Sequence, residues 1–201
     1  MKLYYSPGAC SLAPHIVLNE LGQPYELEKV DLGAKKTETG ADFMNVNGKG
    51  YVPTLDLGTG EVLTEVSTIL QFLADKAKNT DLLPAFGSMD RYRAMEQLNF
   101  VASELHKGIG GLFNAAMPED GKKAMKDRLT RRLVWLDAQL AKKPYLLGDA
   151  YSVADAYAFT VLSWTKHVNV DLSPYAHIVA YLDRVGARPA VQAALKKEGL
   201  A

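Results

Sequence analysis

The sequence predicts an α/β domain built from a βαβ and a ββα unit, followed by an all-helical domain. Three observations predict this fold class. Short strand-like runs alternate with helix-like runs up to residue 78, and no strand-like run follows residue 88. Between them, a stretch rich in turn residues lacks any hydrophobic period. We therefore expect a first domain at 1–78, a linker at 79–87 and an all-helical domain at 88–201.

The first domain is expected to hold two strand–helix units separated by a polar stretch. The expected elements are a strand at 2–5, a helix at 12–21, a strand at 25–30, a hairpin of strands at 52–57 and 61–63, and a helix at 65–77. The polar stretch at 33–50 is expected to be irregular, with 41–46 as its best helical candidate.

The second domain is expected to consist of amphipathic helices around one apolar helix. A long helix is predicted by apolar residues at three- and four-residue steps, namely Ala94, Leu98, Val101, Leu105, Ile109 and Leu112. Further helices are predicted at 129–140, at 156–162 behind a capping-box variant at 152–155, at 178–185, and in a short terminal helix from Arg188-Pro189. The helix at 156–162 is nearly all apolar and should therefore be central.

Composition excludes several classes of function. The 201 residues carry 23 basic and 23 acidic side chains, which leaves no electrostatic footprint for nucleic acid. No run of about 18 apolar residues could span a membrane, and the N-terminus lacks a secretory signal. The single cysteine excludes an internal disulfide, and the four histidines lack metal-ligand spacing. We expect a cytoplasmic protein without metal, nucleic-acid or membrane partners.

The only cysteine, Cys10, is predicted to lie in a strand-to-helix turn at Ser6–Ser11. The free N–H groups and positive dipole end of a helix N-terminus favour a negative charge, and so favour a thiolate. The same donors could hold the sulfur of a bound thiol ligand. The alternative is that Cys10 is a small buried hydrophobe, the commoner state of a lone cysteine.

A group of polar residues on the predicted long helix could form a second part of a ligand-binding site. Asn99, Ser103 and His106 share one face of the predicted long helix, flanked by Glu104 and Lys107. This stripe could line a cleft or be a solvated helix face.

The hairpin adds two more candidates. Val52-Pro53 could form a cis turn that leaves the Val52 backbone free to pair with an extended ligand, or could be an ordinary edge-strand proline. Glu65 opens a helix beside it, either as a cap or as a receptor for a ligand's ammonium group.

Taken together, these motifs resemble the glutathione transferases, and most closely their bacterial beta class. The resemblance is carried by Tyr4 to Leu12, Tyr51-Val52-Pro53, Thr64-Glu65, Ser103-Glu104-Leu105-His106-Lys107 and the capping motif at 152–155, in family-like order across the chain. It implies a thioredoxin-like first domain, a homodimer, and glutathione as co-substrate in detoxification.

The resemblance also implies roles for individual residues. Cys10 would contact the glutathione sulfur and form a mixed disulfide with it, with His106 nearby as the second catalytic residue. Glutathione contacts are implied for Ala9, Cys10, Ser11, Lys35, Tyr51, Val52, Pro53, Glu65, Val66, Asn99, Ser103, Glu104 and Lys107, some from the partner subunit. Val66 departs from the family, which usually has a small or hydroxyl residue there, so we expect helix N–H groups to bind the γ-glutamyl carboxylate more weakly.

Three functions fit this sequence. The leading hypothesis is conjugation of the glutathione thiol to a hydrophobic electrophile. The first alternative is a glutathione-dependent thiol–disulfide oxidoreductase or dehalogenase that uses Cys10; Ala13 occupies the resolving position of a C-x-x-C motif, which excludes a dithiol mechanism. The second is a non-catalytic ligand-binding protein on the same scaffold.

Overall fold

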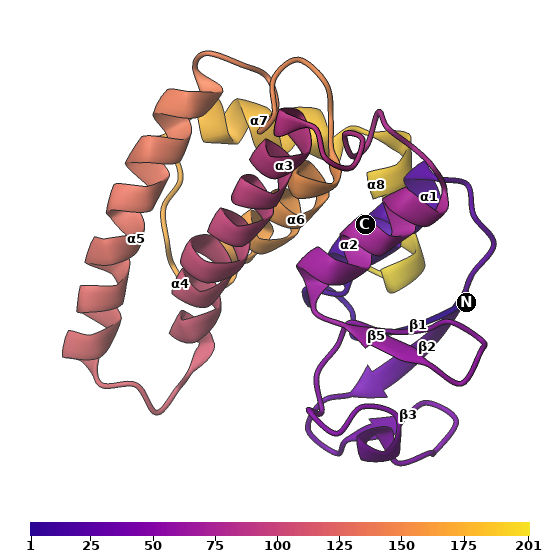
Figure 1. The fold of residues 1–201 in the computed structure, drawn as a ribbon. Helices are drawn as coiled ribbons and strands as arrows, with labels where there is room; N and C mark the ends of the chain where they lie inside the picture. The colour runs from indigo at the N-terminus through magenta and orange to yellow at the C-terminus, as the bar shows by residue number, and fades with distance from the viewer. The chain divides into compact units, whose positions relative to one another are not determined.

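The protein forms two compact units, shown here in a computed structural model that describes residues 1–201 (Figure 1). The first unit comprises Met1–Asn79 together with Arg188–Ala201, and the second comprises Thr80–Ala187. No helix in either unit has both the length and the apolar character needed to cross a membrane.

The first unit is a five-stranded mixed sheet with the strand order β3-β2-β1-β4-β5. Strand β1 pairs in parallel with β2 and antiparallel with β4, and β4 forms the predicted hairpin with β5. The elements are β1 (Lys2–Tyr5), α1 (Leu12–Glu20), β2 (Glu26–Asp31), β3 (Lys36–Thr37), β4 (Thr54–Asp56), β5 (Val62–Thr64) and α2 (Val66–Lys76). The predicted βαβ and ββα units, and with them the thioredoxin-like fold, are confirmed.

The polar stretch at 33–50 contains little regular structure, as expected. It holds the edge strand β3 and one 3-10 turn, Phe43–Asn45, which Asp42 caps by accepting the N–H of Met44. Phe43 is fully buried, and it packs in a cluster with Tyr4, Val30 and Val52. One aromatic side chain therefore anchors a segment whose sequence has no hydrophobic period.

The terminal helix α8 (Pro189–Glu198) belongs to the first unit, where it packs against α1 (Figure 1). This differs from the expected domain 88–201. Arg188 explains part of the attachment, because its guanidinium holds both carboxylate oxygens of Glu20 at 2.7 and 3.0 Å. Val191 and Ala194 bury the apolar face of the helix.

The second unit is all-helical, as predicted. Its longest continuous helical segment begins with α3 (Met89–Phe100). The segment widens into a π-helical turn at Val101–His106 and continues through α4 (Lys107–Gly110) to a 3-10 turn at 111–113. The predicted long helix is thus one continuous path with three kinds of helical turn. The other elements are α5 (Glu119–Leu140), α6 (Val153–Leu162), a 3-10 turn at Ser163–His167 and α7 (Ala176–Gly186).

Helix α6 is the buried centre of this unit, and every one of its residues is buried. The predicted capping box is present: Asp155 accepts the N–H and hydroxyl of Ser152 at 2.8 and 2.7 Å. Burial raises the pKa of Asp155, and the hydrogen bonds only partly offset this. The expected linker is partly packed here, since Leu82 is buried and accepts the N–H of Val153.

Candidate functional site

The turn at Ser6–Ser11 is braced from inside by two serines. The buried Ser11 hydroxyl accepts the N–H of Ser6 at 3.1 Å and donates to the Ser6 carbonyl at 3.2 Å. Because this hydroxyl is turned toward Ser6, no side chain caps the N-terminus of α1. Gly8 takes a left-handed conformation with a φ of 71°, which side chains rarely adopt. The N–H groups of Leu12 and Ala13 donate to the carbonyls of Ala9 and Cys10, so backbone groups of the turn, rather than a side chain, satisfy the first donors of the helix.

Cys10 lies where the turn enters α1, and its side chain is half-buried. The thiol donates to the carbonyl oxygen of Val52, with an Sγ–O distance of 3.2 Å. The Val52-Pro53 peptide bond is cis, which is one of the two alternatives that the sequence left open. The structure thus brings together two motifs that lie 42 residues apart in the chain.

Two further predicted residues flank this cis turn. Lys35 directs its ammonium group to the carbonyl of Gly50, with an N–O distance of 3.0 Å. Tyr51 is 66% exposed, and its carbonyl accepts the side-chain amide of Asn47 at 2.9 Å. Lys35 and Tyr51 therefore border the same side of the first unit as the cis proline.

Glu65 and Val66 form the N-terminus of α2. Glu65 has a φ of 70°, and no side chain caps the helix. Val66 is buried, so its side chain fills the core and offers nothing to a ligand, while the N–H groups of Thr68 and Ile69 already donate to the carbonyl of Glu65. The carboxylate of Glu65 pairs with Lys49 at 2.7 Å, and Lys49 also donates to Thr64.

The polar stripe of the second unit runs from Asn99 in α3 through the π-helical turn to Lys107 in α4. Such turns occur frequently at functional sites. Ser103 donates its hydroxyl to the carbonyl of Asn99 at 2.9 Å. Glu104 is held by Arg128 and Arg132, and the hydrogen bond from Arg132 is the main reason that its pKa is lowered. Lys107 follows directly at the start of α4.

His106 sits in an aromatic pocket of the second unit. Its Nδ1 is hydrogen-bonded to the hydroxyl of Tyr157 at 2.5 Å, and its ring meets the edge of Trp164 at a centroid distance of 5.0 Å. Phe113 also packs edge-on against Trp164, with ring centroids 6.2 Å apart, and is half exposed. These contacts fix the orientation of the imidazole ring.

Comparison with known proteins gives this arrangement a family. A model of the glutathione S-transferase N-terminal domain matches residues 8–76, and a model of the C-terminal domain of the same family matches residues 100–189. The chain belongs to the glutathione S-transferase family. It is 44% identical to a glutathione S-transferase of Escherichia coli O157:H7, and the alignment covers both chains completely.

Two solved structures refine the placement within the glutathione S-transferases. A sphingomonad enzyme complexed with glutathione is 47% identical with a TM-score of 0.95, and the beta-class enzyme of Sphingomonas chungbukensis is 45% identical with a TM-score of 0.96. Both matches cover the whole of each chain. The predicted membership of the bacterial beta class is confirmed.

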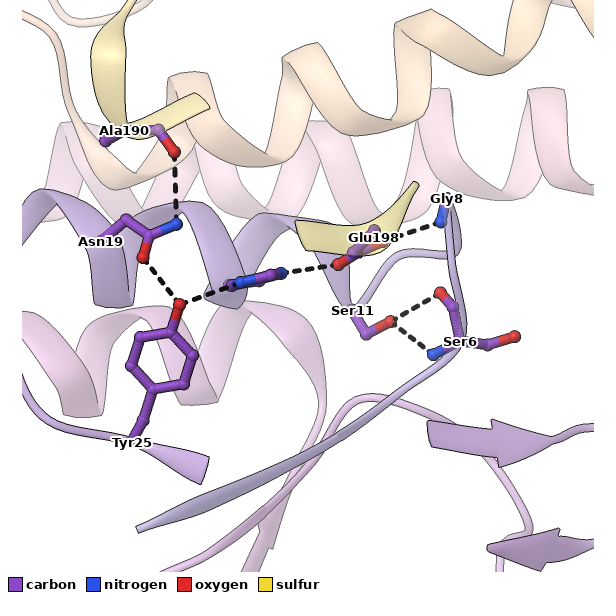
Figure 2. Close-up of polar contacts among 8 residues, drawn as sticks. Ser6, Gly8, Ser11, Asn19, Tyr25, Ala190 and Glu198 are labelled. Atoms are coloured by element: carbon purple, nitrogen blue, oxygen red, sulfur yellow. Dashed lines mark hydrogen bonds and ion pairs between the residues drawn. The ribbon is translucent and has the colours of Figure 1, made fainter. Parts of the chain in front are cut away.

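Several contacts of the candidate residues within each unit were not predicted from the sequence. Nothing in the sequence around Lys49 or Tyr157 indicated that these side chains would contact Glu65 and His106. His15 did give one, since it interrupts a helix face that is otherwise apolar and therefore needs a buried partner. That partner is Glu198 in α8, which also accepts the N–H of Gly8 (Figure 2).

The first-unit geometry suits a tripeptide thiol. The positive end of the α1 dipole beside Cys10 favours a thiolate, the Val52 backbone can pair with an extended peptide, and the N-terminus of α2 combines a positive dipole end with the Glu65 carboxylate. No three His, Cys, Asp or Glu side chains come together as a possible metal site.

Proposed function

We propose that the protein transfers the thiol of glutathione to electrophilic small molecules. In this reaction the glutathione sulfur gives up its proton to solvent or a nearby base. The thiolate then forms a bond to an electrophilic carbon, and the leaving group departs with its electron pair. The oxidation state of the sulfur does not change, so the reaction needs no oxidant or reductant.

The observation that carries this proposal is the position of the Cys10 thiol at the N-terminus of α1, where it donates to the Val52 carbonyl beside the cis proline. A thiol of pKa about 8.5 is only a few per cent ionised at pH 7, and lowering its pKa by about two units takes roughly 2.7 kcal/mol of interactions with the thiolate. Two or three charge-assisted hydrogen bonds at a helix N-terminus are enough for that.

The rest of glutathione is assigned by charge. Glu65 would take the γ-glutamyl ammonium in place of Lys49, and the N–H groups of the α2 terminus would take the adjacent carboxylate. Lys35 would meet the glycyl carboxylate beside Tyr51. Ala9, Ser11 and Pro53 would shape the sulfur pocket between these ends.

The remaining assignments concern the second unit and the biological setting. His106 would assist the thiol, and Asn99, Ser103, Glu104 and Lys107 would complete the site, some of them from a partner subunit. We infer a homodimer that works in the cytoplasm, requires no metal and detoxifies hydrophobic electrophiles.

A second candidate is redox chemistry at Cys10. The half-exposed thiol, as the thiolate, could attack a glutathionylated disulfide, which leaves Cys10 in a mixed disulfide with glutathione and releases the other thiol; a second glutathione could then attack this mixed disulfide, which restores the Cys10 thiol and releases oxidised glutathione. Such a cycle would support disulfide reduction or reductive dehalogenation. It uses the same glutathione site but makes Cys10 indispensable.

Replacing Cys10 by alanine separates the two candidates. We expect Cys10→Ala to retain most of the conjugation of an aryl halide and to lose the mixed disulfide, measured by steady-state kinetics and by intact mass after oxidised glutathione treatment. If the wild-type protein reduces glutathionylated disulfides but conjugates no aryl halide, conjugation is wrong. Binding to immobilised glutathione without any turnover would indicate a non-catalytic ligand-binding protein.

A further inference from the structure

The π-helical turn at Val101–His106 is held by side-chain contacts with two helices of the second unit. Helix α5 packs against the turn, and so does helix α6 (Figure 1). Glu104 contacts α5, whereas His106 contacts α6. Val101 and Leu105 of the same turn are completely buried. The turn therefore has a fixed place in the core, although its hydrogen bonding differs from that of the α-helices before and after it.

Two arginines of α5 hold the carboxylate of Glu104. Arg128 and Arg132 lie four residues apart, so they share one face of the helix. The Nη2 of Arg128 donates to both carboxylate oxygens, at 3.1 and 3.2 Å, and the Nε of Arg132 donates to Oε2 at 2.6 Å. The side chain of Glu104 is only 22% exposed, so the two guanidinium groups replace much of the water that a free carboxylate would bind.

His106 follows Glu104 by two residues and is held by α6 and the turn after it. Its Nδ1 is hydrogen-bonded to the hydroxyl of Tyr157, and its ring lies edge-on to Trp164. Gly110 closes the space around the imidazole, because a Cβ there would lie 3.5 Å from Cδ2 of His106 and 3.7 Å from Cζ3 of Trp164. The fit of the imidazole therefore depends on the angle at which the backbone presents residue 106.

The π-helical turn sets this angle. Its hydrogen bonds run from residue i to residue i+5, so it holds more residues per turn than an α-helix. If the segment took α-helical hydrogen bonding, the residues after it would rotate about the helix axis by up to about 100°, the step of one residue. Such a rotation would take His106 out of its pocket and the carboxylate of Glu104 away from Arg132. The contact between Glu104 and α5 therefore favours the π-helical form over the α-helical one.

We propose that Arg132, assisted by Arg128, is a positioning residue for His106: by holding Glu104 against α5, it stabilises the π-helical turn that directs the imidazole into its pocket. The inference rests on the proposed function, in which His106 assists the glutathione thiol. Neither arginine is assigned a contact with glutathione. Their removal therefore tests the attachment of the turn without deleting an assigned ligand contact.

The test compares Arg132→Ala with Arg132→Lys and with the control Arg131→Ala. Arg131 is the neighbouring arginine on the same helix, and its side chain is exposed. Lysine keeps the positive charge on a long side chain, so it should restore part of the contact with Glu104. The measurements are the backbone carbon-13 shifts of Val101–His106, the imidazole resonances of His106, the kcat/KM for glutathione and the melting temperature.

We expect Arg132→Ala to move the backbone shifts of the π-helical turn and the imidazole resonances of His106. It should lower kcat/KM roughly fivefold, the upper end of what an ion pair of this exposure contributes. Arg132→Lys should lie closer to the wild type, and Arg131→Ala should match it. A folded Arg132→Ala protein with wild-type His106 resonances, an Arg132→Lys protein no closer to the wild type, or an Arg131→Ala protein with the same changes would each overturn the proposal.

A double variant separates the positioning of His106 from a general loss of packing. If Arg132 and Tyr157 both act by orienting the same imidazole, Arg132→Ala combined with Tyr157→Phe should lower kcat/KM little more than either change alone. Independent effects would multiply to a loss of about 25-fold, and that result would overturn the proposal.

Two further arms keep the test decisive. If Arg132→Ala does not fold, Arg128→Ala removes the more exposed of the two arginines and should still move the His106 resonances; unchanged resonances would overturn the proposal. If the wild-type protein conjugates no electrophile, the proposed function fails. The NMR readouts need no turnover, so they then still decide whether the arginines hold the turn and the imidazole in place.

Discussion

Replacing Glu65 by glutamine tests how the site recognises the amino end of glutathione. In the structure the Glu65 carboxylate is 67% exposed and pairs with Lys49, which is 51% exposed. An ion pair with this exposure contributes about 0.2–1 kcal/mol. Glutathione must displace Lys49 to use the carboxylate, and a hydrogen bond to a charged group contributes about 1.5–3 kcal/mol.

The difference between these two terms gives the expected effect. Loss of the charge should weaken glutathione binding by about 1–2 kcal/mol, which corresponds to roughly a 5- to 30-fold rise in KM. The assay is aryl-halide conjugation over a range of glutathione concentrations, with calorimetric titration of glutathione as an independent measure of affinity.

Lys49→Gln is the matched control, because it removes the competing cation and keeps Glu65. We expect this variant to bind glutathione as tightly as the wild type or up to about fivefold more tightly. An unchanged KM in Glu65→Gln would refute the assignment of Glu65 to the ammonium group. A large loss of affinity in Lys49→Gln would instead indicate that Lys49 itself binds glutathione.

Three further predictions concern the second unit. Asp155→Ala leaves four buried hydrogen-bond donors without an acceptor, namely the N–H of Leu146, the hydroxyl of Tyr181, and the N–H and hydroxyl of Ser152. It should lower the free energy of unfolding by roughly 3–5 kcal/mol and the melting temperature by about 10 °C. The exposed control Asp171→Ala should melt like the wild type, and equal melting curves for the two variants would contradict the role of the cap. Because Arg132 lowers the pKa of Glu104, its stabilising effect is present above the ordinary glutamate pKa of about 4.3 and is lost as the pH falls through the lower folded-state value. Urea titrations should therefore find Glu104→Gln less stable by about 1 kcal/mol at pH 7 and equal to the wild type in strong acid, and a difference that persists in acid would contradict the ion-pair explanation. Tyr157→Phe removes the hydroxyl that orients His106 and should lower kcat/KM about fivefold, while wild-type kinetics would show that this hydrogen bond does not matter for catalysis.

Much of the fold could be predicted because its signals are local. Alternating apolar residues and turn residues located the strands of the first unit, and three- and four-residue steps located the helices of the second. The Cys10 turn was also predicted, and the cis form of Val52-Pro53 was one of two alternatives, since each depends on a few consecutive residues. Their contact through Sγ and the Val52 carbonyl follows once β1 and β4 pair.

Other features depend on contacts that no local pattern specifies. The periodicity of α8 shows that one face is apolar but not which unit that face packs against. From the sequence, α8 was therefore expected in the second domain, whereas in the structure it belongs to the first unit. Lys49 and Glu65 lie 16 residues apart in polar segments without a period. His15 and Glu198 are 183 residues apart, and only the buried histidine hinted at its partner.

The central claim is that glutathione binds across the uncapped N-termini of α1 and α2 beside the cis turn. Titration of isotope-labelled protein with glutathione, followed by NMR, tests it most directly. We predict saturable shifts of the backbone amide resonances of Ser11, Val52 and Val66, with Val66 responding through its N–H although its side chain is buried. Saturable binding that leaves these three resonances in place and moves others elsewhere in the chain would contradict the claim.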